Sequence, residues 1–310
     1  MSAAHDLIGV TALRADPMFA GIDGSDLTVV VIDTGVDVTH PLLTSNYLFD
    51  PNTNDPVGWD ILTGGTNPIP TDLHGTHVAG IIGASDPEIG LAPDVNIIGL
   101  QVFQSDGGAW SDDIEAALQW VIQYRQEYNI VAVNMSLGGG FYLTADEAVS
   151  DPTFDEIKFL EEQGVAVVSA AGNYFDVLSH ATRLNNLQST TLNLTDSPGV
   201  ISTFNVGAVY EGDPNDTGLG GFQFISSPDG YAGVYSADLE AAADQITFFS
   251  QRPLAHLDST IFAPGATILS TVPVTSQNPT GLLGENGTSM AAPMVTGAIA
   301  LLQETSLQYG

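Results

Sequence analysis

Four polar side chains in this sequence are of the types that nucleophilic acyl transfer requires. A serine hydroxyl is a weak nucleophile at its ordinary pKa, so it needs a neighbouring base. That base needs a group to orient it, and the oxyanion that forms needs a hydrogen-bond donor. The four candidates are Ser289, His74, Asp33 and Asn173. Each also has an ordinary structural explanation, so the question is whether the fold brings them together.

Ser289 stands where a buried helix is predicted to begin. It lies in the small-residue stretch 287–293, and the apolar residues that follow have helical spacing. These residues are Met294, Val295, Ala298, Ile299, Leu301 and Leu302. Unpaired N–H groups and the positive end of the helix dipole would favour negative charge at this serine. The alternative is that Ser289 only caps the helix, which is a common role of serine.

Strands and helices alternate along the first half of the chain. Short apolar, β-branched runs predict strands, and amphipathic runs between them predict helices. The predicted strands are 27–32, 96–103, 130–135, 165–171, 200–209 and 268–272, and helices begin at His74, Ser111 and Thr153. This order predicts an α/β fold of three layers, in which a mostly parallel central sheet has helices on both faces. We expect residues 36–71 to be an irregular surface stretch.

This topology would bring the four side chains to one edge of the sheet. Asp33 directly follows the first strand and Asn173 follows the fourth, while His74 and Ser289 begin helices that pack on the sheet. Such helices start at the edge where the parallel strands end, which is also where ligands bind in open α/β sheets. With an acid, a histidine, a serine and a carboxamide all at one edge, separate structural explanations for the four residues become improbable.

Charge excludes several classes of function. The chain has 310 residues, with 37 acidic against 5 basic and a net charge of −32. This charge repels nucleic acid and anionic membranes, both of which bind Lys and Arg clusters. Self-repulsion would be relieved in a saline or calcium-containing medium, although the charge could equally serve solubility alone. A field of this sign should also raise the pKa of His74.

Cysteine is absent, which excludes thiol catalysis, disulfides and Cys-type zinc sites. The first 24 residues have no secretory signal, and no apolar run approaches the length of a membrane helix. The end of the chain, only about two helical turns past its last apolar pair, suggests a piece of a longer precursor.

Two polar patterns resemble metal sites without matching one. Asp50, Asn52 and Asn54 have the spacing of a calcium loop, but Asp55 and Ile61 occupy positions that an EF-hand gives to glycine and glutamate. Another oxygen-ligand site remains open there, and an Asx-rich turn is favoured over it. His74 and His77 lack the glutamate and third ligand of a zinc protease, so we interpret His77 as structural.

Four motifs together resemble the subtilisin family of serine proteases. They are 32–35 (IDTG), 74–80 (HGTHVAG), 169–173 (SAAGN) and 287–293 (GTSMAAP), in an Asp, His, Ser order over roughly residues 20–303. The resemblance implies Asp33 as the group that orients His74, and His74 as the general base and acid. It also implies Ser289 as the nucleophile, with Asn173 and the backbone N–H of Ser289 as oxyanion donors.

The family also implies a substrate site. A polypeptide substrate would lie extended between two edge segments, formed by Gly107, Gly108 and Ala109 and by Ser136, Leu137 and Gly138. Trp110 and Leu137 would line the pocket for the residue four before the cut. Ala170, Ala171 and Gly172 would form a wall of the primary pocket, with room for a bulky apolar side chain.

Departures from the family concern metal ions. Leu42 follows His40-Pro41 where many members have a calcium-binding aspartate, and the loop 84–91 is too short to wrap that ion. We therefore expect this site to be absent. Asp60 and Asp72 flank a weaker calcium site of some relatives and are not assigned one. No cofactor is needed for the chemistry, a structural calcium is allowed elsewhere, and the metal ligands stay unknown.

We expect one catalytic domain over residues 1–310, with a surface insertion at about 211–245 and without the C-terminal end of the family domain. Residues 174–198 have no counterpart that can be aligned. We expect a secreted or extracellular monomer. The rival hypotheses are an inactive subtilisin-fold scaffold and a transpeptidase that passes the acyl group to an amine. A metal-dependent hydrolase is excluded for want of ligands.

Overall fold

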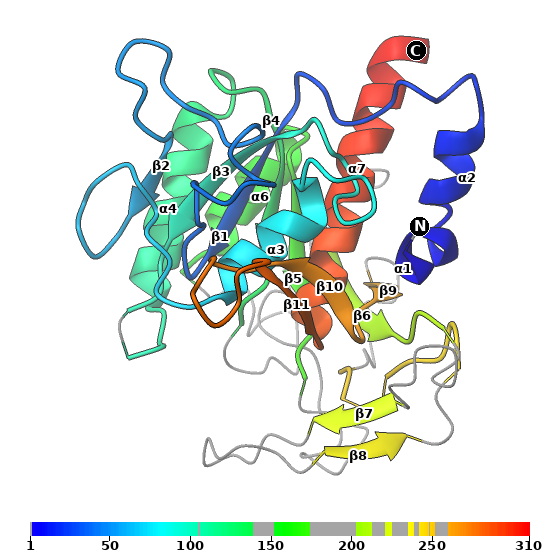
Figure 1. Cartoon of the computed structure of the whole chain (residues 1–310). Helices are drawn as coiled ribbons and strands as arrows, with labels where there is room; N and C mark the ends of the chain where they lie inside the picture. The colour runs from blue at the N-terminus through cyan, green and yellow to red at the C-terminus, as the bar shows by residue number, and fades with distance from the viewer. Residues whose placement is uncertain are drawn as a thin grey trace.

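The fold is built on one parallel sheet of seven strands. The computed structural model describes residues 2–104, 106–138, 152–173, 203–212, 221–224, 235–238, 242–247, 249–251 and 260–310. The strands run in the order β2-β3-β1-β4-β5-β6-β9, all parallel (Figure 1). Their bounds are β1 Thr28–Asp33, β2 Gly58–Asp60, β3 Asn96–Gln101, β4 Ile130–Met135, β5 Ala166–Ala170, β6 Thr203–Val209 and β9 Thr260–Pro264.

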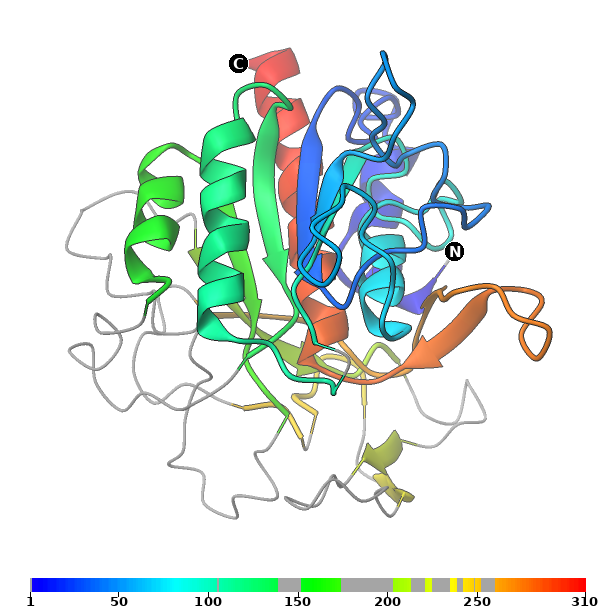
Figure 2. The ribbon, with the colours of Figure 1, turned by 90° about the vertical axis from the view of Figure 1, so that its left-hand side faces the viewer.

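Helices cover both faces of the sheet, as predicted. α3 (His74–Gly83) and α7 (Thr288–Tyr309) pack on one face, and α4 (Ser111–Tyr124) and α6 (Phe154–Glu162) pack on the other (Figure 2). The central strands are apolar on both faces because alternate side chains enter two separate cores. In β1, Val29 and Val31 join the α3–α7 core, whereas Val30 and Ile32 join the α4–α6 core.

In the described part of the chain, two antiparallel strand pairs lie outside this sheet. The predicted strand 268–272 exists as β10 (Ile268–Thr271), but it pairs with β11 (Leu282–Glu285) and docks on α3 instead of joining the sheet. Ser270 Oγ donates to the carbonyl of His77 at 2.7 Å. Gly80 permits this approach, because a Cβ there would lie 2.2 Å from Thr271 Oγ1. β7 (Gly221–Phe224) and β8 (Tyr235–Asp238) fall within the predicted insertion.

The prediction for residues 36–71 was wrong in part. This segment supplies β2, an edge strand of the main sheet, and several buried side chains. Tyr47 is buried, and its hydroxyl donates to the carbonyl of Val57 at 2.9 Å while it accepts from the N–H of Gly99 at 3.0 Å. The buried residues of this segment have no regular period in sequence, so a search for periodicity does not find them.

The N-terminal segment forms two short helices that sequence analysis did not predict. α1 spans Ala3–Leu7 and α2 spans Val10–Ala15, and both add an apolar residue to the α3–α7 core. No helix in the described part of the chain is long and apolar enough to cross a membrane. The segment 174–198 and most of the predicted insertion lie outside the described residues.

Candidate active site

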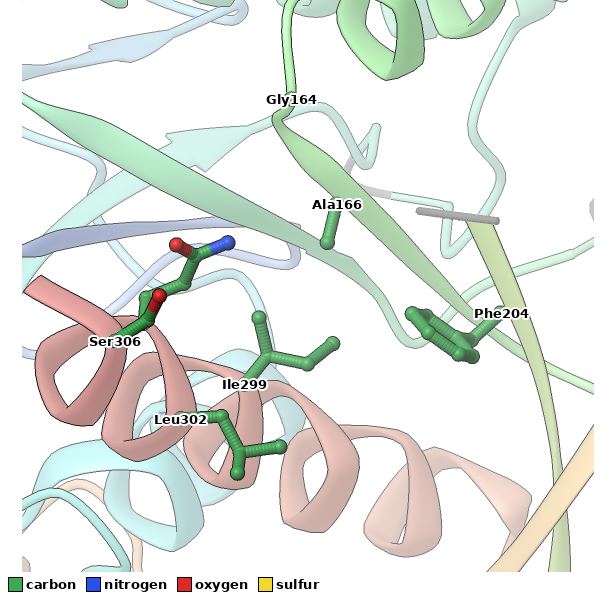
Figure 3. Close-up of a pocket in the computed structure, with 7 residues that line it drawn as sticks. Gly164, Ala166, Phe204, Ile299, Leu302 and Ser306 are labelled. Carbon is green, nitrogen blue, oxygen red and sulfur yellow. The ribbon is translucent and has the colours of Figure 1, made fainter. Parts of the chain in front are cut away.

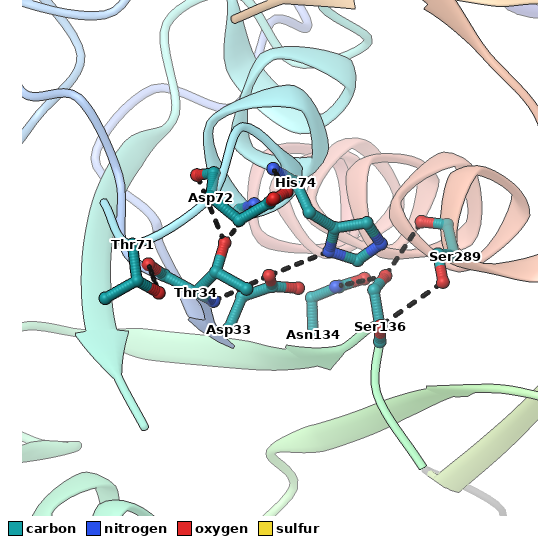
Figure 4. Close-up of polar contacts among 9 residues, drawn as sticks. Asp33, Thr34, Thr71, Asp72, His74, Asn134, Ser136 and Ser289 are labelled. Atoms are coloured by element: carbon teal, nitrogen blue, oxygen red, sulfur yellow. Dashed lines mark hydrogen bonds and ion pairs between the residues drawn. The ribbon is translucent and has the colours of Figure 1, made fainter. Parts of the chain in front are cut away.

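Asp33 and His74 meet at the carboxyl edge of the sheet. Asp33 is the last residue of β1 and is fully buried, whereas His74 begins α3 and keeps 28% of its side chain exposed. His74 Nδ1 lies 2.8 Å from Asp33 Oδ1 (Figure 4). Because a carboxylate can only accept, Nδ1 carries the proton and Nε2 is left as the basic nitrogen.

Backbone hydrogen bonds hold this pair in place. The N–H of Thr34 donates to Asp33 Oδ1 at 2.7 Å, and the N–H of Gly75 donates to Thr34 Oγ1 at 2.9 Å. The N–H of His74 donates to Asp72 Oδ1 at 3.0 Å, so Asp72 caps the first turn of α3. These bonds fix the position of the imidazole before any substrate arrives.

Ser289 lies in the first turn of α7, as predicted. Figure 4 shows the His74 ring between Asp33 and Ser289, with its second nitrogen on the side of Ser289. Ser289 Oγ donates to the carbonyl of Ser136 at 3.2 Å. Rotation of the hydroxyl would redirect this proton, and hydrogen bonds of this kind often tighten only when substrate binds.

A proline explains a second contact at this serine. Pro293 lies inside α7 and has no N–H, so the helical bond from residue 293 to the carbonyl of Ser289 cannot form. Ser136 Oγ donates to that carbonyl at 2.8 Å instead. Ser136 in turn accepts from Asn134 Nδ2 at 2.9 Å, and Thr296 donates to Asn134 Oδ1 at 2.9 Å. Sequence analysis missed this network between β4 and α7.

Asn173 is oriented by Thr288. The N–H and the hydroxyl of Thr288 both donate to Asn173 Oδ1, at 2.8 and 3.0 Å. Because the backbone N–H of Thr288 can only donate, its partner is the carboxamide oxygen. The Asn173 NH₂ group therefore points away from Thr288 and is available to donate. This Nδ2 would lie 3.4 Å from a Cβ at Gly287, so the carboxamide lies directly beside the residue that precedes α7.

The pKa of His74 is raised, as the sequence predicted, but by near neighbours. Burial lowers this pKa, while the charge and hydrogen bond of Asp33 and the charges of Asp72 and Glu285 raise it by more. Glu285 is half-buried, and burial raises its own pKa. The shift of His74 is therefore explained by three specific carboxylates, of which sequence analysis had identified only Asp33 as its partner.

His77 agrees with the structural role predicted for it. The side chain is fully buried one turn after His74, and its Nε2 lies 3.0 Å from the carbonyl of Leu283 in β11. Burial lowers the pKa of His77 to about 4, so the ring is neutral and donates through Nε2. This bond fastens the β10–β11 hairpin, and with it Glu285, beside the first turn of α3.

The predicted substrate segments lie at the same edge of the sheet. Residues 107–109 connect β3 to α4, with Ala109 in an antiparallel bridge to Phe103, and residues 136–138 directly follow β4. Trp110 is exposed, whereas Leu137 is mostly buried in the α4–α6 core. Their role as pocket walls stays a prediction.

The carboxylates once considered for calcium are engaged by backbone N–H groups. Asp50 Oδ1 accepts from the N–H of Asn52 at 2.7 Å and of Thr53 at 3.2 Å, which confirms the Asx turn favoured there. Asp60 Oδ1 accepts from two N–H groups in the same way. Within the described ranges, no group of three or more His, Asp and Glu side chains is placed to hold a metal.

A cavity of about 260 Å³ lies far from this site (Figure 3). Its lining includes Ile299, Leu302 and Ser306 of α7, and at 1.5 Å per residue Leu302 is about 20 Å along the helix from Ser289. Leu302 was predicted to be buried, but 64% of it is exposed. The prediction was wrong because the buried side chains at this point of the helix are Ala300 and Leu301, whereas Leu302 lies on another side of α7, which borders this cavity.

These features define a protein with a subtilisin-like α/β fold and an Asp–His pair beside a helix-borne serine. Residues 24–309 match the model of the subtilase family, so this chain belongs to the subtilase family of serine endopeptidases. Catalysis in that family needs no cofactor, and its substrates are polypeptides.

Individual relatives agree with this assignment. The chain is 29% identical to the major intracellular serine protease of Bacillus subtilis over 95% of its length and 74% of that protein's. It is 30% identical to subtilisin E of the same organism over 95% of its length, but spans only 60% of subtilisin E. The crystal structure of a cold-adapted subtilisin-like serine proteinase matches with a TM-score of 0.62 at 25% identity, covering 92% of this chain and 78% of that one.

Proposed function

We propose that this chain cleaves internal peptide bonds through an acyl-enzyme formed on Ser289. The observation that carries the proposal is the 2.8 Å contact between Asp33 and His74, which fixes the tautomer of an imidazole whose other nitrogen faces Ser289 (Figure 4). Asp33 orients His74 and stabilises the imidazolium, and His74 Nε2 is the base.

The reaction follows from these positions. His74 Nε2 takes the proton of Ser289 as Oγ attacks the scissile carbonyl, and the oxyanion accepts hydrogen bonds from Asn173 Nδ2 and the N–H of Ser289. His74 then gives its proton to the leaving amine. A water molecule, deprotonated by the same nitrogen, hydrolyses the acyl group and frees Ser289.

We propose that the substrate lies extended between residues 107–109 and 136–138, because both segments follow parallel strands at the site. Trp110 and Leu137 border the pocket for the residue four before the cut. Ala170, Ala171 and Gly172 form a wall of the primary pocket. These assignments, a single domain over 1–310 and a monomeric state stay predictions, to be tested by peptide profiling and by sedimentation.

Secretion also stays a prediction. It is inferred from the resemblance to the family, and the charge of −32 would suit a saline medium. The relatives include a major intracellular serine protease, so family membership does not decide the compartment. Fractionation of cells that produce the protein, with antibody detection, would decide it.

Intact-mass labelling with a fluorophosphonate tests the proposed function. The wild-type chain should gain one adduct, Ser289→Ala should gain none, and Asn173→Ala should react about 100- to 1,000-fold more slowly. That range is carried over from subtilisin itself, in which an oxyanion asparagine has been removed. Failure of a folded wild-type chain to react would overturn the proposal and favour an inactive scaffold.

A further inference from the structure

Three main-chain carbonyl groups in one short turn converge on a single guanidinium group. Arg14 of α2 donates to the carbonyl oxygens of Pro87, Gly90 and Leu91, at 2.7, 2.9 and 2.8 Å. The turn connects α3 to β3, more than 70 residues away in sequence. Arg14 is half-buried there, so these charge-assisted bonds are partly sheltered from water.

The turn is built so that these carbonyls need a cation. Two of its own N–H groups are used inside it, because those of Ile89 and Gly90 both donate to the carbonyl of Asp86 at 2.9 Å. A Cβ at Gly90 would lie 2.1 Å from the carbonyl oxygen of Ala84, so only glycine allows this closure. Among the backbone hydrogen bonds of the described residues, none is accepted by the three converging carbonyls.

Converging carbonyl oxygens are ligands that calcium commonly uses. The residues present do not fit calcium here, however. Leu42 has no side-chain oxygen that could bind a metal. Its backbone carbonyl already accepts from the N–H of Ser85 at 2.9 Å. The three carbonyls already face the positive charge of Arg14, which would repel a second cation. Burial lowers the pKa of Arg14 and the charge of Glu88 opposes this, but an arginine in a protein remains protonated.

We propose that Arg14 is the resident cation of this turn and replaces a structural metal ion there. The guanidinium neutralises the carbonyl dipoles and fastens α2 to residues 86–91. The neighbouring α1 is held by burial of Ala4, which shares the α3–α7 core with Val10 and Leu91. This part of the fold therefore keeps its structure without calcium.

Hydrogen exchange at residues 86–92 tests this directly, on full-length protein carrying Ser289→Ala to prevent self-digestion. Exchange in the parent should be the same in chelator and in calcium. Arg14→Gln should speed it by about tenfold or more and lower the unfolding midpoint by about 2–6 °C, because bonds from a charged donor are lost. Arg14→Lys should lie between the two, since lysine keeps the charge without the planar fork.

Lys158→Gln is the matched control, because it removes one positive charge from an exposed position on α6. It should leave exchange at residues 86–92 unchanged. Two results would overturn the proposal. One is faster exchange in the parent when calcium is removed, which would mean that a metal holds the turn. The other is unchanged exchange in Arg14→Gln, which would mean that the guanidinium is not needed. Neither depends on whether Ser289 is the nucleophile.

Discussion

At the scale of single residues, a hydrogen bond to one atom of a side chain fixes what the other atom of that side chain can do. Asp33 accepts the hydrogen bond from His74 Nδ1–H, so Nε2 is the nitrogen that the proposed mechanism uses as base. Thr288 takes the oxygen of Asn173, so the NH₂ group is left to donate. In both cases a neighbouring hydrogen bond assigns the chemical role, which residue type alone does not do.

The carboxylates around His74 predict a shift in pH dependence. Because His74 must be neutral to act as base, activity is lost below its pKa, and a raised pKa places this acidic limb above that of an ordinary histidine. Glu285→Gln removes one of the charges that raise it. The acidic limb of kcat/KM against pH should therefore move to lower pH.

Glu162→Gln controls for net charge, because Glu162 is exposed on α6 at the other face of the sheet. Its acidic limb should coincide with that of the wild type. A limb that moves equally in both variants would show that the overall charge, and not Glu285, sets the pKa of His74.

At the scale of elements, α7 is positioned by a bond that its own proline makes necessary. The small residues of its first half let it pack closely on β4, β5 and β6, and Ser136 satisfies the carbonyl that Pro293 leaves without a helical partner. The first turn of α7 therefore depends on the end of β4. Ser289, the proposed nucleophile, is therefore held from outside its own helix.

A double-mutant cycle tests this dependence. Ser136→Ala should lower the free energy of unfolding by about 1–3 kcal/mol, because the partly buried Ser289 carbonyl loses its partner, and should lower kcat more than it raises KM. Pro293→Ala supplies an N–H that can bond the same carbonyl. Combined with Ser136→Ala, it should recover part of the loss in thermal stability.

Ser276→Ala, at an exposed serine in the β10–β11 connection, should change neither quantity. Strict additivity of the Ser136 and Pro293 substitutions would contradict the shared carbonyl, because two changes that share no partner add.

At the scale of the whole molecule, a net charge of −32 opposes the compact state. Salt should relieve this, since going from about 0.01 M to about 1 M shortens the Debye length from about 30 Å to about 3 Å. The unfolding midpoint should therefore rise along a sodium chloride series, measured by calorimetry on the Ser289→Ala variant. Potassium chloride should act alike, because screening depends on ionic strength. A midpoint that stays flat would mean that the charges are too widely spaced to repel.

The buried part of the site should respond less to the same salt. Asp33 is fully buried against His74, and buried pairs are screened much less than exposed ones. The overall charge and the contact with Asp33 can thus be separated, because the first is sensitive to ionic strength in the folded protein and the second largely is not.

The class of fold and the four candidate side chains could be predicted from residue types and their spacing alone. Strand and helix patterns are local, and the topology of a parallel sheet then places Asp33, His74, Asn173 and Ser289 at one edge without further information. The same reasoning failed where burial has no period, as in residues 36–71, and where an apolar residue lies on the uncovered side of a helix, as at Leu302.

Which atoms meet became visible only in the folded arrangement of the chain. Asn173 and Thr288 are 115 residues apart, Ser136 and Ser289 are 153 apart, and Arg14 lies more than 70 residues from the turn that it holds. Each of these bonds joins two segments that are far apart in sequence and are brought together by packing. A hydrogen bond needs its two atoms within about 3 Å, and no pattern of residue types along a chain specifies distances of that kind.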